Sequence, residues 1–279
     1  MTKAYVRFPD FKRKAVTLSY DDGPRQDKRL IEIMKKHGLK GTFNLNSGCF
    51  EKEYCGVEKG AMTVKEALDL YLPSGMEVAI HGYKHMSLPN VDFAMATNDI
   101  CQDRKELERI FGRIINGMAY ANGAYSDEIV EMLKANGVKY ARTVISTESF
   151  NLPTDWLRLP TTCHHKNPRL MELARSFVEQ EEHPYFWRNA PIMFYLWGHS
   201  YEFDNNDNWN VIEEFAEYIG GREDVWYATN GEIFNYLEAS DRLEFSMDAT
   251  RIHNPTATKI WLDLFGKKLT VSPGETVVL

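Results

Sequence analysis

The stretch Ala15-Val16-Thr17-Leu18-Ser19-Tyr20-Asp21-Asp22-Gly23-Pro24 ends an apolar run with two adjacent carboxylates. Further along the chain, His81 and His85 follow a second apolar run at residues 76–80. One carboxylate and two imidazoles leave room for water on a metal ion, which is how proteins hold catalytic zinc. We therefore expect one carboxylate to bind a metal while its neighbour stays free to take a proton.

Strand-like and helix-like segments alternate over most of the chain, and capping boxes begin at Thr63 and Thr229. Repeated strand–helix units predict a parallel sheet or barrel, in which chemistry gathers at the carboxyl ends of the strands. The residues that directly follow an expected strand include Asp21, Asp22, His81, Asn122 and His199. The expected strands are 14–20, 41–45, 76–80, 116–120, 139–143 and 192–197, and the expected helices are 27–37, 63–70, 93–111, 126–135, 168–179, 210–219 and 231–237.

Two motifs resemble the polysaccharide deacetylase family, carbohydrate esterase family 4. Its first motif, Thr-Phe-Asp-Asp-Gly-Pro, is similar to Ser19-Tyr20-Asp21-Asp22-Gly23-Pro24, and its second, His-Ser/Thr-x-x-His, is similar to His81-Gly82-Tyr83-Lys84-His85. The match extends over about residues 14–238. The resemblance implies a distorted, incomplete (β/α)-barrel, and a flavodoxin-like doubly wound sheet is the alternative fold.

The resemblance also implies roles for the residues at the strand ends. Asp21 is expected to be the general base, and Asp22, His81 and His85 to hold a divalent metal. We expect zinc, with cobalt, nickel or manganese as alternatives. If residues 81–85 are helical, the i and i+4 imidazoles lie on one side. His199 follows an apolar strand as in the fifth motif of the family, which implies that it is the general acid, although Ser200 stands where the family carries Asp.

The third motif departs from the family, because Ala119 stands where many members carry an Arg that pairs with the catalytic Asp. We expect Arg158 to take its place and the backbone N–H of Asn122 to stabilise the oxyanion. Trp197 is expected either in the core or as a sugar-stacking wall. His164 and His165 are expected to reach the pocket from its far side, or to lie in an exposed loop. The other residues expected to bind substrate are Tyr120, Asp155 and Trp156, of which the last two resemble the fourth motif.

The composition is that of a globular protein of 279 residues, with a net charge of −7 that argues against nucleic-acid binding. No run is long enough to span a membrane, and the N-terminus lacks the apolar core of a signal peptide. We therefore expect a cytoplasmic protein whose four cysteines are free thiols. Because Cys163 precedes His164 and His165, a second metal site is conceivable there, although a buried thiol is the simpler interpretation.

The pattern changes near residue 240, where short strand-like segments with turns at Gly266 and Gly274 predict a small β appendage. We therefore expect a catalytic domain at residues 1–239 and an appendage at 240–279. The appendage is expected to act as a lid or edge cover, with carbohydrate binding as the alternative.

The expected activity is hydrolysis of the acetyl amide of an N-acetylated saccharide. An O-acetyl xylan esterase or another amidase using the same site is the enzymatic alternative. A sugar-binding protein with a decayed site is the other class, motivated by Ala119. We expect a short, soluble saccharide as the substrate, because aromatic residues within 156–190 can wall one end of the groove. Those residues include Trp156, Tyr185, Phe186 and Trp187.

Overall fold

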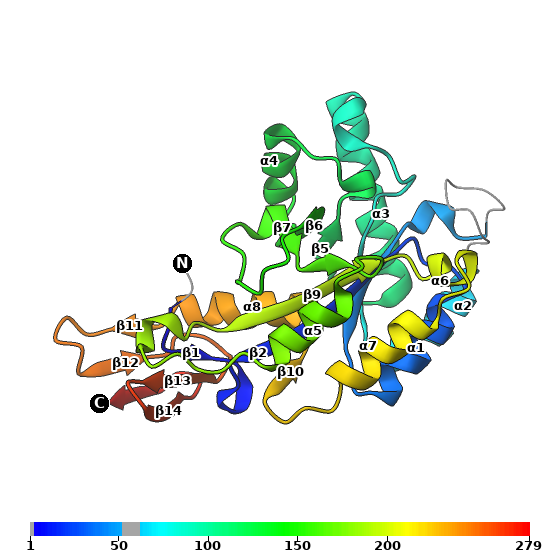
Figure 1. The fold of residues 1–279 in the computed structure, drawn as a ribbon. Helices are drawn as coiled ribbons and strands as arrows, with labels where there is room; N and C mark the ends of the chain where they lie inside the picture. The colour runs from blue at the N-terminus through cyan, green and yellow to red at the C-terminus, as the bar shows by residue number, and fades with distance from the viewer. Residues whose placement is uncertain (1–2, 52–61) are drawn as a thin grey trace.

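The computed structural model describes residues 3–51 and 62–279, and a parallel sheet forms the centre of this part of the chain (Figure 1). Its main path has the order β7-β6-β5-β4-β3-β2-β9-β8, and β10 pairs with the first half of β2. Every pairing within this sheet is parallel. The strands are β2 (Lys14–Asp21), β3 (Gly41–Leu45), β4 (Glu77–Ile80), β5 (Gly117–Ala119), β6 (Tyr140–Ser146), β7 (Leu159–Thr161), β8 (Cys163–His164), β9 (Ile192–Gly198) and β10 (Val225–Tyr227).

The strand order confirms the barrel-like fold. Neighbours run consecutively from β2 to β7, and the late strand β9 returns to pair with β2, as the last strand of a (β/α)-barrel does. The barrel does not close, because its edge strands β7 and β8 do not pair with each other. The two strands follow one another in the sequence and are connected by Thr162. A flavodoxin-like sheet requires a reversal of strand order at its centre, which this consecutive order does not show.

Amphipathic helices pack their apolar faces on this sheet. In α1 the buried residues Leu30, Ile31 and Met34 have helical spacing, and they join Val16 and Leu18 of β2 in the main core. Both expected capping boxes are formed, at Thr63 and Thr229. The helices are α1 (Asp27–Lys36), α2 (Val64–Tyr71), α3 (Phe93–Phe111), α4 (Asp127–Ala135), α5 (Leu170–Val178), α6 (Tyr201–Asn205), α7 (Asn210–Ile219) and α8 (Asn230–Asp241).

Two small antiparallel sheets lie beyond the amino ends of β2 and β9, at the left of Figure 1. One contains β1 (Val6–Arg7), β13 (Ile260–Leu264) and β14 (Lys267–Val271), and the other contains β11 (Glu244–Phe245), β12 (Arg251–His253) and β15 (Thr276–Val278). Ile260 and Leu262 share a second core with Ala15 and Met193, so these sheets cover one end of the barrel. Because β1 pairs with β13, the N-terminal strand belongs to the same layer, and the boundary at 239/240 stays a prediction.

The aromatic residues 185–187 lie at the same end. They lie just before Ile192, the first residue of β9, whereas His199 lies just after Gly198, the last residue of that strand. A strand rises about 3.3 Å per residue, so the length of β9 separates these aromatic residues from His199. Phe186 packs against Phe265, with ring centroids 4.4 Å apart, in the turn between β13 and β14. The prediction that Tyr185, Phe186 and Trp187 wall the substrate groove is therefore wrong.

The structure also corrects the expected cysteine chemistry. Cys49 is disulfide-bonded, while Cys101 and Cys163 are free thiols, and Cys55 lies outside the described residues. The expected cytoplasmic location stays a prediction. Among the described helices, none combines the length and the apolar character that a membrane crossing requires.

Candidate active site

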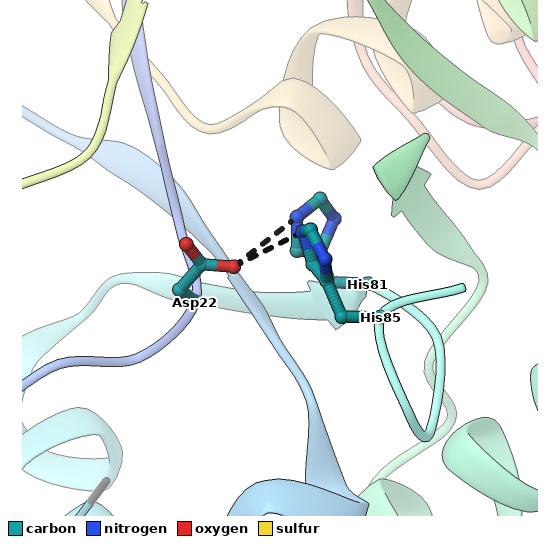
Figure 2. Close-up of side chains that lie close together, drawn as sticks. All are labelled: Asp22, His81 and His85. Carbon is teal, nitrogen blue, oxygen red and sulfur yellow. Dashed lines mark ion pairs between the residues drawn. The ribbon is translucent and has the colours of Figure 1, made fainter. Parts of the chain in front are cut away.

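Asp22, His81 and His85 converge at the carboxyl ends of β2 and β4 (Figure 2). The Asp22 Oδ1 atom lies 3.5 Å from His81 Nε2 and 3.4 Å from His85 Nε2. The two imidazole rings lie 4.9 Å apart at an angle of 66°. Asp22 and His81 are buried, whereas the side chain of His85 is 18% exposed. The predicted ligands are thus gathered at one point that solvent reaches from the His85 side.

The segment that carries the two imidazoles is a turn and not the helical segment considered from the sequence. Residues 81–85 form no helical element, and Gly82 and His85 have φ values of 85° and 54°. Glycine adopts this left-handed region without strain, whereas histidine does so at a cost. The turn, rather than helical periodicity, therefore brings His81 and His85 to the same side.

These three side chains fit a divalent metal ion. The Asp22 Oδ1 atom is buried and accepts no hydrogen bond from the described residues, which is costly for a carboxylate unless a cation binds it. The His81 Nδ1 atom lies 2.9 Å from the Ala119 carbonyl, which can only accept, so the proton sits on Nδ1 and the Nε2 lone pair faces Asp22. Such a carbonyl commonly orients a metal-binding histidine. Burial also lowers the pKa of the His81 imidazole, which favours the neutral form that binds metals.

Asp21 is held as a buried anion beside the candidate metal ligands. Its Oδ2 atom accepts a hydrogen bond from Arg142 of β6, and its Oδ1 atom accepts one from Asn44 Nδ2 at 2.8 Å. Burial by itself raises the pKa of the Asp21 carboxyl. The positive charge of Arg142, with contributions from the imidazoles of His81 and His199, outweighs this effect and lowers the pKa to about 2.

The partner expected for Asp21 was Arg158, and the structure corrects this. Arg158 instead forms ion pairs with Asp155 and Asp127, both at 2.6 Å. Asp155 also caps the short helix 156–158 by accepting a hydrogen bond from the Leu157 N–H at 2.9 Å, and Trp156 packs edge-on against Phe234. These contacts lie outside the carboxylate–histidine cluster, so the pocket-lining role of Asp155, Trp156 and Arg158 gains no support from them.

His199 follows β9 and faces the two aspartates. Its Nε2 atom lies 3.8 Å from Asp21 Oδ2 and 3.9 Å from Asp22 Oδ2, and its Nδ1 atom lies 3.6 Å from Glu202 Oε2. Burial lowers the pKa of the His199 imidazole, but the carboxylates of Glu202, Asp21 and Asp22 outweigh it and raise the pKa above its usual value. The side chain is 21% exposed, so it can meet a bound substrate.

Glu202 is the centre of a cluster of basic groups behind His199. Its Oε2 atom lies 3.2 Å from His164 Nε2 and 3.0 Å from His165 Nε2, and Lys166 Nζ donates to its Oε1 atom at 2.7 Å. Burial raises the pKa of the Glu202 carboxyl, but these donors hold it well below its usual range. His165 is buried and stacks on Phe203, with ring centroids 4.2 Å apart, which places it behind His199 rather than in an exposed loop.

The same cluster is where a second metal site was considered. The Lys166 N–H donates to His164 Nδ1 at 3.1 Å, so the neutral ring carries its proton on Nε2 and donates it toward Glu202. A metal would need the lone pair of that Nε2 atom. Cys163 is buried, and burial raises its thiol pKa to about 12, which disfavours the thiolate that binds metals. These two observations disfavour His164 and Cys163 as ligands. However, His164, His165 and Glu202 offer ligand atoms within 4.8 Å of one another, and Glu202 Oε2 and His165 Nε2 have no hydrogen-bond partner among the described residues, so a second metal site here stays a prediction.

Trp197 and two residues that follow β5 are the remaining residues that the sequence predicted at the active site. Trp197 is 8% exposed, and its ring lies 4.4 Å below the Arg142 guanidinium, so it belongs to the core and supports Arg142. Tyr120 is buried, and its hydroxyl donates to the Leu157 carbonyl at 2.8 Å. Asn122 lies in the turn 121–123 after β5, with a φ of 56°. Its oxyanion role stays a prediction.

Arg142, Asn44 and Glu202 are the residues of this site that the sequence interpretation missed. An arginine inside the apolar run Tyr140-Ala141-Arg142 signals a buried cation that needs an anion. Glu202 follows His199 at a spacing of three residues, which brings side chains together in a helical turn. Asn44 gives no comparable signal, because a single asparagine in a strand is uninformative.

Comparison with protein families confirms the resemblance seen in the motifs. Residues 9–141 match the family model described as polysaccharide deacetylase. This range contains the three candidate metal ligands and Asp21 but not Arg142, His199 or Glu202. A comparison with curated protein sequences finds no significant match.

Solved structures with the same fold include two deacetylase-type proteins. A putative polysaccharide deacetylase from Mycobacterium smegmatis is 17% identical with a TM-score of 0.60, and the match covers 86% of this chain and 96% of that one. A family 4 carbohydrate esterase from Streptomyces lividans, in complex with acetate, is 14% identical with a TM-score of 0.50, over 78% and 93%. The Puue allantoinase is 13% identical with a TM-score of 0.57, over 82% and 91%. At these identities the likeness concerns the fold.

Proposed function

We propose that the chain, whose residues 9–141 match the polysaccharide deacetylase family model, is a metal-dependent hydrolase that removes acetyl groups from an N-acetylated saccharide. The observation that carries the proposal is the convergence of Asp22, His81 and His85, with Oδ1–Nε2 distances of 3.5 and 3.4 Å. Asp21 and His199 flank this trio, and a carboxylate and an imidazole are the groups that move protons in amide hydrolysis.

Different residues of the chain are proposed to bind the metal, to accept a proton and to stabilise the oxyanion. A divalent cation, zinc in the first instance, would be held by Asp22, His81 and His85 and would supply Lewis acidity and an acidified water. Asp21 is fixed by Arg142 and Asn44, so its carboxylate stays anionic and oriented as the acceptor of the proton. The backbone N–H of Asn122 is proposed to face the oxygen on which negative charge develops.

His199 is proposed to protonate the departing amine. An amine is a poor leaving group, so the reaction needs a proton donor on the side of the departing nitrogen. Glu202 lies 3.6 Å from Nδ1 of His199, and a proton on Nδ1 would be held toward it, leaving Nε2 directed at the aspartates. The charge of Glu202 thus favours the protonated form of His199.

The alternative of a sugar-binding protein with a decayed site was motivated by Ala119, which stands where many family members carry an arginine. Arg142 supplies the guanidinium from another strand, and this favours a working enzyme over a sugar-binding relative. O-acetyl esters and other amides remain enzymatic alternatives, since the same residues serve both. A cyclic ureide belongs among them because an allantoinase shares the fold.

Short, soluble saccharides are the substrates proposed first. The aromatic wall expected at residues 185–187 does not support this choice, because those residues lie at the other end of the barrel. The remaining support is the net charge of −7, which disfavours adhesion to an anionic polymer.

The test is metal analysis of the purified protein together with acetate release from chitooligosaccharides of increasing length, peptidoglycan fragments and acetylated xylan, and with hydrolysis of allantoin. We expect one divalent ion per chain and highest efficiency on a short N-acetylated sugar. His81→Ala and His85→Ala should each lose the ion. If both variants keep stoichiometric metal, the ligand assignment is wrong, and if acetylated xylan is preferred, the esterase alternative replaces the deacetylase.

A further inference from the structure

Two carboxylates of α3 face the turn that carries His81 and His85. Asp99 and Asp103 are one helical turn apart, so they share a face of the helix, and both are buried, at 2% and 0% exposure. Neither belongs to the motifs of the sequence or to the cluster around the candidate metal site. Burying an aspartate is costly unless its oxygens accept hydrogen bonds, so we looked for the donors that contact each carboxylate.

Asp103 joins the ends of two neighbouring strands. Its Oδ1 atom accepts from the backbone N–H and the hydroxyl of Ser47, at 2.7 and 2.5 Å, just beyond β3. Its Oδ2 atom accepts from the backbone N–H of His81, at 3.1 Å, just beyond β4, and the same N–H also donates to the Leu45 carbonyl at 3.1 Å. The carboxylate therefore fixes the point at which the first imidazole leaves the sheet.

Asp99 holds the second half of the turn. Its Oδ1 atom accepts from the backbone N–H of Lys84 at 3.0 Å, the residue before His85. The carboxylate also lies against Gly82, where a Cβ atom would stand only 2.7 Å from Asp99 Oδ2. Gly82 is thus required both by its φ of 85° and by the closeness of this carboxylate.

Asn46 fixes the turn from the other side. Its Nδ2 atom donates to the carbonyls of His81 and Gly82, at 2.8 and 2.6 Å. Donors and acceptors of the turn are therefore both taken by buried side chains, those of α3 and of Asn46 just after β3. A turn with two residues of positive φ is kept in one conformation when its surroundings hold it in this way.

We propose that Asp99 and Asp103 are positioning residues that hold the turn 81–85 in the conformation needed to bind a divalent metal. The inference rests on the proposed function, because it assumes that His81 and His85 are ligands. Without Asp99 the Lys84 N–H loses its acceptor, and without Asp103 the His81 N–H keeps only the Leu45 carbonyl, so the two imidazoles are held less firmly opposite Asp22. The metal would then have to order the turn as it binds, which weakens its affinity.

The test measures the dissociation constants of Zn²⁺ and Co²⁺ by competition with a chelator. Asp99→Asn and Asp103→Asn keep the size of the side chain, and we expect each to weaken binding by about 10- to 100-fold, the usual effect of residues that orient metal ligands. Amide hydrogen exchange at residues 81–84 should become faster in the metal-free variants, which is a readout independent of activity.

The matched control is Glu77→Gln. Glu77 is a partly buried carboxylate, and it accepts from the Gly231 N–H and the Thr42 hydroxyl, both at 2.8 Å, at the opposite end of β4. We expect this variant to lose stability without losing metal affinity. Gly82→Ala is the second variant, because it pushes the turn away from Asp99 while leaving both carboxylates in place, and it should weaken metal binding as well.

The outcomes separate this inference from the proposed function. Wild-type affinity in folded Asp99→Asn, Asp103→Asn and Gly82→Ala would overturn the positioning role alone, and so would equal weakening in Glu77→Gln. If the aspartate variants do not fold, Gly82→Ala decides the matter by itself. Failure of the wild-type protein to bind either metal would overturn the proposed function, and the inference with it.

Discussion

Arg142, in the middle of β6, donates a hydrogen bond to Asp21 at the end of β2, across the three strands that separate them in the sheet. Both side chains are buried, and the Arg142 guanidinium also lies over the ring of Trp197. The curvature of the sheet turns the inner faces of β6 and β2 toward each other. Arg142 thereby supplies the cation that the third motif lacks at Ala119.

We expect substitutions at Arg142 and Asp21 to have strong and non-additive effects on the free energy of unfolding. Arg142→Met leaves the Asp21 carboxylate buried without its cation, and breaking a buried ion pair in this way costs about 3–5 kcal/mol. Asp21→Asn in the same chain removes the stranded charge, so the double variant should be more stable than Arg142→Met alone. Urea denaturation of the wild-type protein, both single variants and the double variant gives the coupling energy. Additive losses would show that the two side chains act independently.

Asp21→Asn should keep the metal and lose most of the turnover. Asparagine preserves the shape of the side chain and its contact with Asn44 but cannot accept a proton, and positioned acid–base groups contribute about 10²–10⁴-fold. Turnover on a chitooligosaccharide, measured beside the metal content, checks this. Activity within a few-fold of the wild type would mean that Asp21 serves only as the partner of Arg142.

His199→Ala should impair amide substrates more than activated esters, because a phenolate leaves without a proton and an amine does not. Glu202→Gln should show the same selectivity to a smaller degree, since it keeps the imidazole and removes the charge beside Nδ1. The measurement compares kcat/KM for an N-acetylated oligosaccharide and for nitrophenyl acetate. Equal losses on both substrates would place His199 in binding or folding.

The sequence predicts the parts of this molecule that depend on local pattern. The strand at Gly41–Leu45 and the helix at Phe93–Phe111 have the predicted bounds, because their apolar residues are periodic over the whole element. The candidate metal-binding residues could be found because each motif is contiguous and each follows a strand. Strands β7 and β8 contain only three and two residues, which is too short for any period to appear.

What the sequence could not predict depends on how distant segments meet. Arg142 and Asp21 are separated by 121 positions, and only the curvature of the sheet decides which carboxylate the arginine reaches. In the same way, the pairing of β1 with β13 brings the two ends of the chain together. The i, i+4 spacing of His81 and His85 is compatible with a helix as well as with a turn, and only the structure shows that the backbone at Gly82 and His85 is left-handed.

A last prediction concerns Asp27, a buried carboxyl at the start of α1 that no proposed step uses. Its oxygens accept hydrogen bonds from the hydroxyls of Tyr71 and Ser200, at 2.6 and 2.5 Å. Burial raises the pKa of the Asp27 carboxyl from its ordinary value of 3.8 to about 7, despite these bonds. The folded protein therefore keeps a proton on Asp27 between about pH 4 and 7 that the unfolded chain releases.

Because the folded state binds the extra proton in that window, the free energy of unfolding falls as the pH rises through it, by at most about 1.4 kcal/mol per pH unit from this group. Below pH 4 and above pH 7 the contribution is constant. Asp27→Asn has no proton to lose, so its stability relative to the wild type should improve from pH 4 to 7 and then level off. Urea denaturation of both proteins at a series of pH values, with a chelator present so that no metal binds Asp22, measures the difference and cancels the effects of other groups. A stability difference that does not change with pH would show that Asp27 is ionised in the folded protein, with its charge stabilised by Tyr71 and Ser200.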